Sequence, residues 1–335
     1  MKRSILKAVL GFMTLGLILL PAFDAQARRH HNQNRAAKVA KAPMPTSSIV
    51  KQTYTFAVEG NDTLKMDVYR ARVAKPGPAL IFAFGGAFTH GSIDDPRYLP
   101  FFKFMAENGV TVISTAYRTL LKGISIPSGP EALPYFVKRL VVAVKGASAD
   151  YCKGTAFVLE HCAEWNIDPQ KIFACGSSAG AITALQTEYA LVNQGIAGFP
   201  QGWNYAGVIS FAGSIFSEGP LVWESAPAPM AFFHGDADCN VPFGELTFSG
   251  AGLYGPEPIT KSLDESKVPY WFNRFNGSDH DIAISAMNTR MGEVLDFIHS
   301  IIDGKPVKVE SVQTIPGMGA YKTRFTIEDY IKANL

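Results

Sequence analysis

Apolar and polar residues alternate near the start of the chain, and short, mostly apolar runs follow further on. The alternation covers residues 53–59 and 64–69, on either side of the turn signal "GND". It predicts an antiparallel hairpin with one face in water. The later runs are typical of strands that are buried on both faces of a parallel sheet. They cover residues 79–84, 110–116, 171–175, 207–212, 229–233 and 270–275.

Helical patterns lie between these runs. They cover residues 98–108, 134–147, 149–165, 179–193 and 286–302. Strands that alternate with helices after an antiparallel start predict a doubly wound α/β fold, with about eight mostly parallel strands and helices on both faces of the sheet. We expect this domain to span residues 50–302. Residues 303–335 are predicted to be a C-terminal tail that packs on the domain, with a short helix at "TIEDYIKANL".

The N-terminal segment has a different character. Three basic residues precede an apolar run over residues 8–20, and a small-x-small site, "AQA", ends at Ala27. This pattern predicts a cleaved secretory signal peptide over residues 1–27, because the run is shorter than the roughly 20 residues of a membrane span. An uncleaved anchor is the alternative. Residues 28–49 are predicted to be a disordered basic leader. The mature protein is then periplasmic or secreted, without membrane insertion.

Composition adds few further constraints. The 335 residues are 47% hydrophobic and 18% charged, as in ordinary globular proteins. Removal of the signal peptide leaves equal numbers of basic and acidic side chains, so overall charge predicts no nucleic-acid partner. Four cysteines fit no metal-site spacing, and we expect no metal. They are Cys152, Cys162, Cys175 and Cys239. The first two are predicted to lie too far apart on one helix to form a disulfide, and other pairings stay open.

A serine lies between two glycines where a buried strand is predicted to end and a helix to begin. The stretch is "GSSAG", residues 176–180. A serine there lies on a sharp, strained turn, with its hydroxyl at the carboxyl edge of the sheet. Ser178 has the required spacing to both glycines, and Ser177 does not. The helix that begins at Ala179 points its amide end at the reacting centre.

A serine nucleophile needs a base, and in this architecture the order along the chain is serine, acid, histidine. His299 falls inside the last amphipathic helix, and His234 precedes the obvious acids. His280 follows the last predicted strand in "NGSDHDIA" and is therefore the predicted base. For the acid, "HGDADCNVP" offers Asp236 and Asp238, and spacing alone leaves the two nearly even.

The remaining element is an oxyanion site. The stretch "IFAFGGAFTHG" follows the third predicted strand with consecutive small residues at positions 85–87. Such a stretch can turn its amide groups inward to meet the amide of Ala179. We therefore predict that Gly86, Ala87 and Ala179 form the oxyanion hole.

Four motifs stand together in this order: "FGGAF", "GSSAG", "HGDAD" and "NGSDH", with "AYR" at 116–118. In these motifs the chain resembles the esterase/lipase branch of the α/β-hydrolase fold, and above all secreted bacterial esterases related to the hormone-sensitive-lipase group and to feruloyl- and acetyl-xylan-esterase-like domains. The family's H-G-x-x-D-x-x-V-P loop selects Asp238 as the acid. Its oxyanion motif has a histidine where this chain has Phe84 and a third glycine where it has Ala87.

The resemblance implies a carboxylesterase that uses a Ser178–His280–Asp238 triad and an acyl-enzyme, without cofactors, on small or polysaccharide-linked esters. Two alternatives are a serine peptidase of the dipeptidyl-peptidase type and a non-catalytic binding module on a hydrolase scaffold. Aromatic side chains near the predicted site are candidates for substrate binding. They are Tyr98, Phe216 and Trp223.

Overall fold

A computed structural model describes residues 49–71, 74–248, 250–314 and 323–334. The expected signal peptide, and the basic leader up to residue 48, lie outside this range. Within the described part of the chain, no helix combines the length and apolar character that crossing a bilayer requires.

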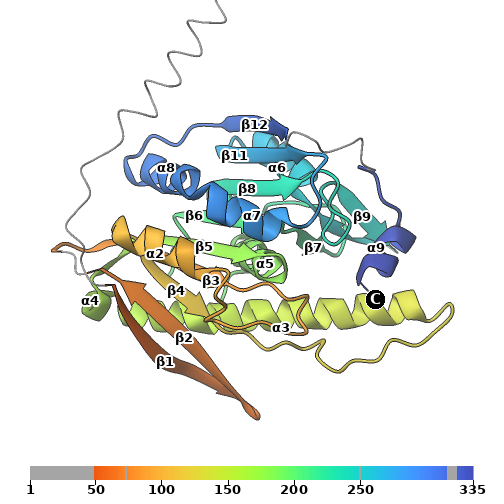
Figure 1. Cartoon of the computed structure of the whole chain (residues 1–335), viewed down its shortest axis with the longest axis horizontal. Coiled ribbons are helices and arrows are strands. Elements are labelled where there is room, and N and C mark those ends of the chain that lie inside the picture. Colours follow the sequence, from red (N-terminus) through yellow and green to blue (C-terminus); the bar gives the residue numbers. More distant parts are fainter. Residues whose placement is uncertain (1–48, 72–73, 249, 315–322, 335) are drawn as a thin grey trace, which may run out of the picture. The chain divides into compact units, whose positions relative to one another are not determined.

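The described residues form one nine-stranded sheet with the order β1-β2-β4-β3-β5-β6-β8-β11-β12 (Figure 1). Its strands are β1 Val50–Glu59, β2 Asp62–Arg70, β3 Gly77–Ala83, β4 Thr111–Thr115, β5 Ile167–Ser177, β6 Gly207–Phe211, β8 Met230–Gly235, β11 Tyr270–Asn276 and β12 Val309–Thr314. β2 is antiparallel to both β1 and β4, and every other neighbouring pair is parallel. The prediction of a mostly parallel α/β sheet is confirmed.

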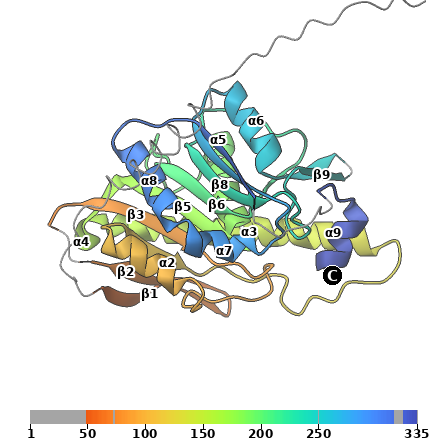
Figure 2. The same ribbon diagram turned by 45° about the horizontal axis from the view of Figure 1, so that its top comes forward.

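Helices cover both faces of this sheet. α2, α7 and α8 pack together on one face, and α3 and α5 on the other (Figure 2). The helices up to residue 302 are α2 Leu99–Glu107, α3 Ala132–Glu160, α4 Cys162–Trp165, α5 Ala179–Gln194, α6 Pro256–Glu265, α7 Ile282–Thr289 and α8 Met291–Ile302. The pattern expected as one helix over 286–302 is thus two helices that meet at Arg290. The two helices expected between 134 and 165 are a continuous α3 followed by the short α4.

The sheet continues into the stretch that we expected to be a tail. β12 pairs in parallel with β11, between Val309↔Trp271 and Thr314↔Asn276. Its sequence, VESVQT, places half-buried and exposed residues in alternation, as suits an edge strand with one wet face. This polar content is why the strand was not recognised in the sequence. A further helix, α9 Ile327–Asn334, forms within "TIEDYIKANL".

A second, smaller sheet was also not predicted. Its strands are β7 Ile215–Ser217, β10 Ala251–Tyr254 and β9 Glu245–Phe248, in that order and antiparallel. Each has three or four residues, too few to give a clear hydrophobic period. β9 and β10 form a hairpin, which reaches the cavity described below.

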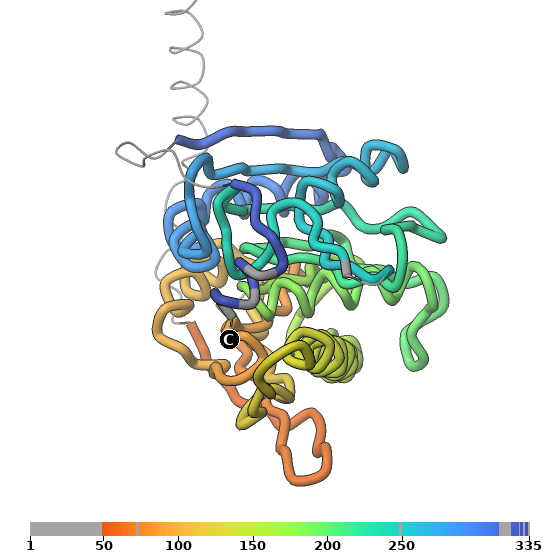
Figure 3. Tube along the Cα trace, turned by 90° about the vertical axis from the view of Figure 1, so that its right-hand side faces the viewer, coloured from red at the N-terminus to blue at the C-terminus, as the bar shows by residue number. Residues whose placement is uncertain are grey.

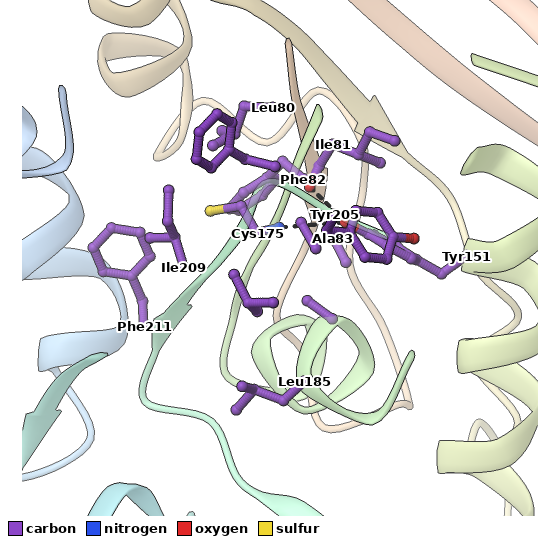
Figure 4. Close-up of a cluster of buried hydrophobic side chains, with 14 of the residues drawn as sticks. Leu80, Ile81, Phe82, Ala83, Tyr151, Cys175, Leu185, Tyr205, Ile209 and Phe211 are labelled. Atoms are coloured by element: carbon purple, nitrogen blue, oxygen red, sulfur yellow. Dashed lines mark hydrogen bonds between the residues drawn. The ribbon is translucent and has the colours of Figure 1, made fainter. Parts of the chain in front are cut away.

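Buried hydrogen bonds connect α3 to the two central strands β3 and β5 (Figure 4). The buried Tyr151 hydroxyl donates to the carbonyl of Ile81 at 2.7 Å and accepts from the amide of Cys175 at 3.3 Å. One residue earlier on α3, the buried Asp150 pairs with the guanidinium of Arg118 at 2.8 Å. The two Tyr151 bonds fix the strands that lead into the oxyanion loop and the serine turn, and the Asp150 pair fixes the segment after β4. All four cysteines are free.

Candidate active site

Ser178 occupies a tight turn between β5 and α5, with φ 54° and ψ −122°. Such a backbone conformation is strained for a residue with a side chain, and it persists only when its surroundings hold it. The two flanking glycines leave no room for a Cβ atom. One built on Gly176 would lie 2.2 Å from the backbone of Gly180, and one on Gly180 would lie 2.0 Å from the carbonyl oxygen of Ala83. Strand and helix therefore approach each other as closely as the motif predicts.

The structure brings together the three residues that the sequence predicts as a triad. The hydroxyl of Ser178 lies 2.8 Å from Nε2 of His280, and Nδ1 of His280 lies 2.7 Å from Oδ2 of Asp238. They follow β5, β11 and β8, whose carboxyl ends meet at one edge of the sheet. Because a carboxylate only accepts, Nδ1 of His280 carries the proton, and Nε2 is free to accept from Ser178.

Asp238 is fully buried, and four N–H groups lie close to its two oxygens. Oδ1 accepts from the amides of Asn240 and Val241, each at 2.8 Å. Oδ2 accepts from His280 and lies 3.2 Å from Nε2 of His234. Burial raises the pKa of this carboxyl, but the bonds from His234 and His280 outweigh it and hold the pKa well below the usual range. Asp238 is therefore a buried anion at neutral pH.

His234 is a member of this cluster that sequence reasoning set aside. It is buried, and its Nε2 also lies 3.1 Å from the carbonyl oxygen of Val241. Both neighbours of Nε2 are acceptors, so this nitrogen carries a hydrogen. The available signal was its place four residues before Asp238, at the end of β8. His234 thus orients the acid.

Asp236, the other candidate acid, has different partners. Its carboxylate accepts from the amide of Gly277 at 2.6 Å and pairs with Arg274 at 2.6 Å. These partners distinguish the two candidate acids, which sequence spacing could not separate, because only Asp238 reaches the ring of His280. Asp236 instead ties the loop after β8 to the end of β11.

The charge state of His280 depends on the acids around it. Burial lowers the pKa of its ring, but the hydrogen bond and charge of Asp238, with the charges of Asp279 and Asp281, together raise the pKa above its ordinary value. Only the neutral ring can accept a proton from Ser178. The array is therefore poised for base catalysis above the ordinary titration range of histidine.

The predicted oxyanion loop has an unusual backbone. Gly86, Ala87 and Phe88 have consecutive positive φ values of 141°, 51° and 58°. Successive amides in such conformations can form a concavity that binds anions. A Cβ atom on Gly86 would lie 2.0 Å from the carbonyl oxygen of His90, so only glycine fits there. These residues line one cavity with Ser178 and with Ala179, whose first-turn amide has no helical acceptor.

Two buried tyrosines hold this loop. The hydroxyl of Tyr98 accepts from the amide of Gly85 at 3.0 Å, and that of Tyr117 donates to the carbonyl of Phe84 at 2.7 Å. The rings of Phe84 and Tyr117 stack with centroids 4.5 Å apart. Tyr98, expected as a substrate-binding residue, lines the cavity beside Ser178 but is only 1% exposed, and its hydroxyl supports the loop.

The cavity beside Ser178 has a volume of about 760 Å³. Part of its wall is polar and is formed by Thr89, His90, Arg97, Asn240 and Asp281. Another part is apolar and is formed by Ile124, Ile126, Leu133, Phe136, Val137, Leu140, Leu246, Leu253 and Ile327. A ligand that is polar at one end and apolar at the other matches this division.

The structure does not bring the other two predicted aromatics to this cavity. Phe216 lines a small neighbouring hollow instead. Trp223 packs against Tyr189, with ring centroids 5.2 Å apart, and donates to Ser262 at 2.9 Å. Among the described residues, no three histidine, cysteine or acidic side chains gather to hold a metal ion.

We compared the chain with known proteins in sequence and in structure. No family model matches the chain. A protein named as an esterase, NocK from Nocardia uniformis subsp. tsuyamanensis, is 29% identical over 135 residues, which span 40% of this chain and 36% of that protein.

Solved structures of esterase 2 from Thermogutta terrifontis match more of the chain. The apo form covers 78% of this chain and 98% of its own, with 20% identity and a TM-score of 0.55. A butyrate-bound form covers 76% and 95%, with 21% identity and a TM-score of 0.56. A form phosphorylated by paraoxon covers 76% and 95%, with 19% identity and a TM-score of 0.53. The chain therefore has the α/β-hydrolase fold of these esterase structures.

Proposed function

We propose that this protein is a serine-dependent carboxylic ester hydrolase. The observation that carries the proposal is the continuous line of hydrogen bonds from Ser178 through His280 to the buried Asp238, at the wall of a cavity. Nucleophile, base and orienting acid within hydrogen-bond reach are the signature of nucleophilic catalysis. The α/β-hydrolase fold, shared with a known esterase, supports the same reaction class.

The reaction proceeds in two acyl-transfer steps. Ser178 Oγ attacks the ester carbonyl while Nε2 of His280 takes its proton, and Asp238 stabilises the imidazolium. The amides of Gly86, Ala87 and Ala179 hold the tetrahedral oxyanion. The C–O bond to the alcohol breaks as His280 protonates the leaving oxygen, which leaves an acyl-enzyme on Ser178. Water then repeats the sequence and releases the acid.

The substrates are small or carbohydrate-linked esters. A cavity of about 760 Å³ is in the range that holds small-molecule ligands. Esterase 2 of Thermogutta terrifontis has been solved with propionate and with butyrate, which supports short acyl groups for this chain too. We further propose that the signal pattern in residues 1–27 directs the protein to the periplasm or the medium, where such esters from outside the cell are accessible.

Adjacent serines offer a matched test. Ser177 is buried and its hydroxyl donates to the carbonyl of Ala283 at 2.9 Å, away from the base. Ser178→Ala should reduce hydrolysis of p-nitrophenyl butyrate by at least about 10⁴-fold. Ser177→Ala should keep activity within about tenfold of wild type, since it removes one neutral hydrogen bond. Fluorophosphonate labelling, followed by fragment mass spectrometry of the modified peptide, should locate the adduct on Ser178.

Other outcomes point elsewhere. An adduct on Ser177, or full activity of Ser178→Ala, would contradict the nucleophile assignment. Turnover of dipeptide amides without turnover of esters would indicate a peptidase. A folded wild type that neither turns over substrates nor reacts with the probe would indicate a non-catalytic binding module.

A further inference from the structure

The apolar part of the cavity borders a second hollow of about 50 Å³. Five side chains line both spaces, and we call them the apolar recess. They are Val137, Leu140, Leu246, Leu253 and Ile327. Beyond them the hollow is lined by Val141, Phe216, Ala251 and Gly252, none of which has a polar side chain. The apolar recess therefore lies between the cavity that holds the nucleophile and the hollow that holds Phe216.

Three segments that are distant in sequence build the recess. They are the N-terminal turns of α3, the hairpin of β9 and β10, and the C-terminal helix α9. Figure 1 shows these elements gathered at one end of α3, and in Figure 3 the blue C-terminal helix lies beside the near end of that helix. The recess is therefore open to a ligand only where these three segments leave space between them.

The N-terminal turns of α3 carry an apolar stripe that faces the cavity. Leu133, Phe136, Val137 and Leu140 have the i, i+3, i+4, i+7 spacing of one helix face, and all four line the cavity. All four are only partly buried, and the buried residues of α3 begin at Ala143. Such a stripe normally packs against a protein core, and here a ligand chain would complete its burial.

α9 closes the recess and is attached to the triad. Ile327 and Tyr330 line the cavity, and the hydroxyl of Tyr330 donates to the backbone carbonyl of Asp238 at 3.2 Å. Thr326 and Asp329 cap the helix reciprocally, with the amide of Thr326 donating to the Asp329 carboxylate at 2.7 Å. These bonds set the distance between the wall of the recess and the catalytic residues.

We infer that the apolar recess binds the linear aliphatic acyl chain of the ester, with the carbonyl at Ser178 and the chain end in the hollow beside Phe216. The inference rests on the proposed function and names the acyl class for that same site. The alcohol then leaves through the polar part of the cavity, at Thr89, His90 and Arg97. An acyl chain of medium length can contact both the apolar recess and the apolar lining of the hollow. A sugar ring in the recess would instead lose its hydrogen bonds to water.

Arg139 lines the cavity, and its buried Nε has no hydrogen-bond partner among the described residues. It does not line the hollow. A terminal carboxylate on the acyl chain would pair with this guanidinium, whereas a neutral chain would not, so half-esters of dicarboxylic acids separate the two substrate classes.

The first experiment measures binding without catalysis. Calorimetric titration of Ser178→Ala with butanoate, hexanoate, octanoate and decanoate should show affinity that rises about threefold to fourfold per added methylene until the recess is full. This readout needs no nucleophile, so it survives failure of the proposed function. Affinity that does not depend on chain length would overturn the inference even if Ser178 is the nucleophile.

The second experiment uses two valines of the same helix. Val137 lines the recess, and Val142 is 45% exposed and lines neither space. In the otherwise wild-type enzyme, Val137→Trp should lower kcat/KM for p-nitrophenyl octanoate at least about tenfold more than it lowers kcat/KM for the acetate. Val142→Trp should change kcat/KM for neither the octanoate nor the acetate by more than about twofold.

Three results would overturn the inference. One is equal loss of acetate and octanoate hydrolysis in Val137→Trp. Another is the same loss of octanoate hydrolysis in Val142→Trp. The third is a wild-type preference for the half-ester of octanedioic acid over the octanoate ester, which Arg139→Leu abolishes.

Discussion

The catalytic edge and the apolar recess meet in one cavity but are held in different ways. At the catalytic edge, formed by the triad and residues 84–88, hydrogen bonds fix nearly every group, and Asp238 alone is close to four N–H donors. The recess is made of aliphatic side chains that only pack. The first region fixes directions, which acyl transfer requires, and the second offers volume and apolar surface, which a flexible chain requires.

This difference has a measurable form. Substitutions at the catalytic edge should lower kcat for every ester by the same factor, because they disturb the transition state common to all. Substitutions in the recess should redistribute activity among chain lengths. A catalytic-edge variant that changes the chain-length profile would break the comparison.

The largest effect is expected at the acid. Asp238→Asn should lower kcat by about 10⁴-fold, because the amide no longer holds the imidazole in its catalytic tautomer or balances the imidazolium. Asp236→Asn should leave kcat of the folded enzyme within about tenfold and lower the free energy of unfolding by about 2–3 kcal/mol, since it weakens the pair with Arg274. Stopped-flow or steady-state kinetics and chemical denaturation measure the two quantities. The reverse pattern would show that the acid is Asp236.

A smaller effect is expected where tyrosines support the oxyanion loop. Tyr98→Phe leaves the buried amide of Gly85 without its acceptor, and kcat should fall about tenfold with little change in KM. Tyr117→Phe should act in the same direction through Phe84. The acetate-to-octanoate ratio of kcat/KM should stay at the wild-type value in both variants. A shifted ratio would mean that these tyrosines contact the acyl chain.

The smallest effect is a shift in pH dependence. Asp281 lines the cavity, and its charge helps to raise the pKa of His280. Asp281→Asn removes that charge, so the protonated ring is less favoured and its pKa falls. The acid limb of the kcat/KM profile should then move to lower pH by a fraction of a unit, with the plateau nearly unchanged. A shift to higher pH would contradict the electrostatic account of the base.

The sequence was most informative about functional residues that come directly after a strand. Ser178, His280 and the 85–87 turn each follow an apolar run, so the sheet alone predicts that they meet. Spacing could not separate Asp236 from Asp238, because the distinction depends on Arg274 and on the amides after the loop. The resemblance selected Asp238, the aspartate that the structure places beside His280.

The sequence was least informative about the recess. Its wall comes from α3, a hairpin of very short strands, and a helix almost at the end of the described chain, and no motif links these three. Phe216 and Trp223 were predicted as aromatics in a segment after the sixth strand; the structure places Phe216 in the small hollow beside the cavity and Trp223 in neither space. His234 was missed because its role depends on a carboxylate oxygen that it meets only in the folded chain.

α3 also bears on how this protein can change over evolutionary time. Its buried residues all lie at or beyond Ala143, whereas the side chains that face the cavity lie in the earlier turns. Truncation of a large side chain in the buried half, such as Tyr151, removes core packing and costs about 2–5 kcal/mol, out of a total folding stability of about 5–15 kcal/mol. One in the earlier, partly solvated turns costs much less. The buried half of this helix therefore tolerates few substitutions and the earlier half tolerates more, so new substrate preferences are accessible by single mutations without loss of the fold.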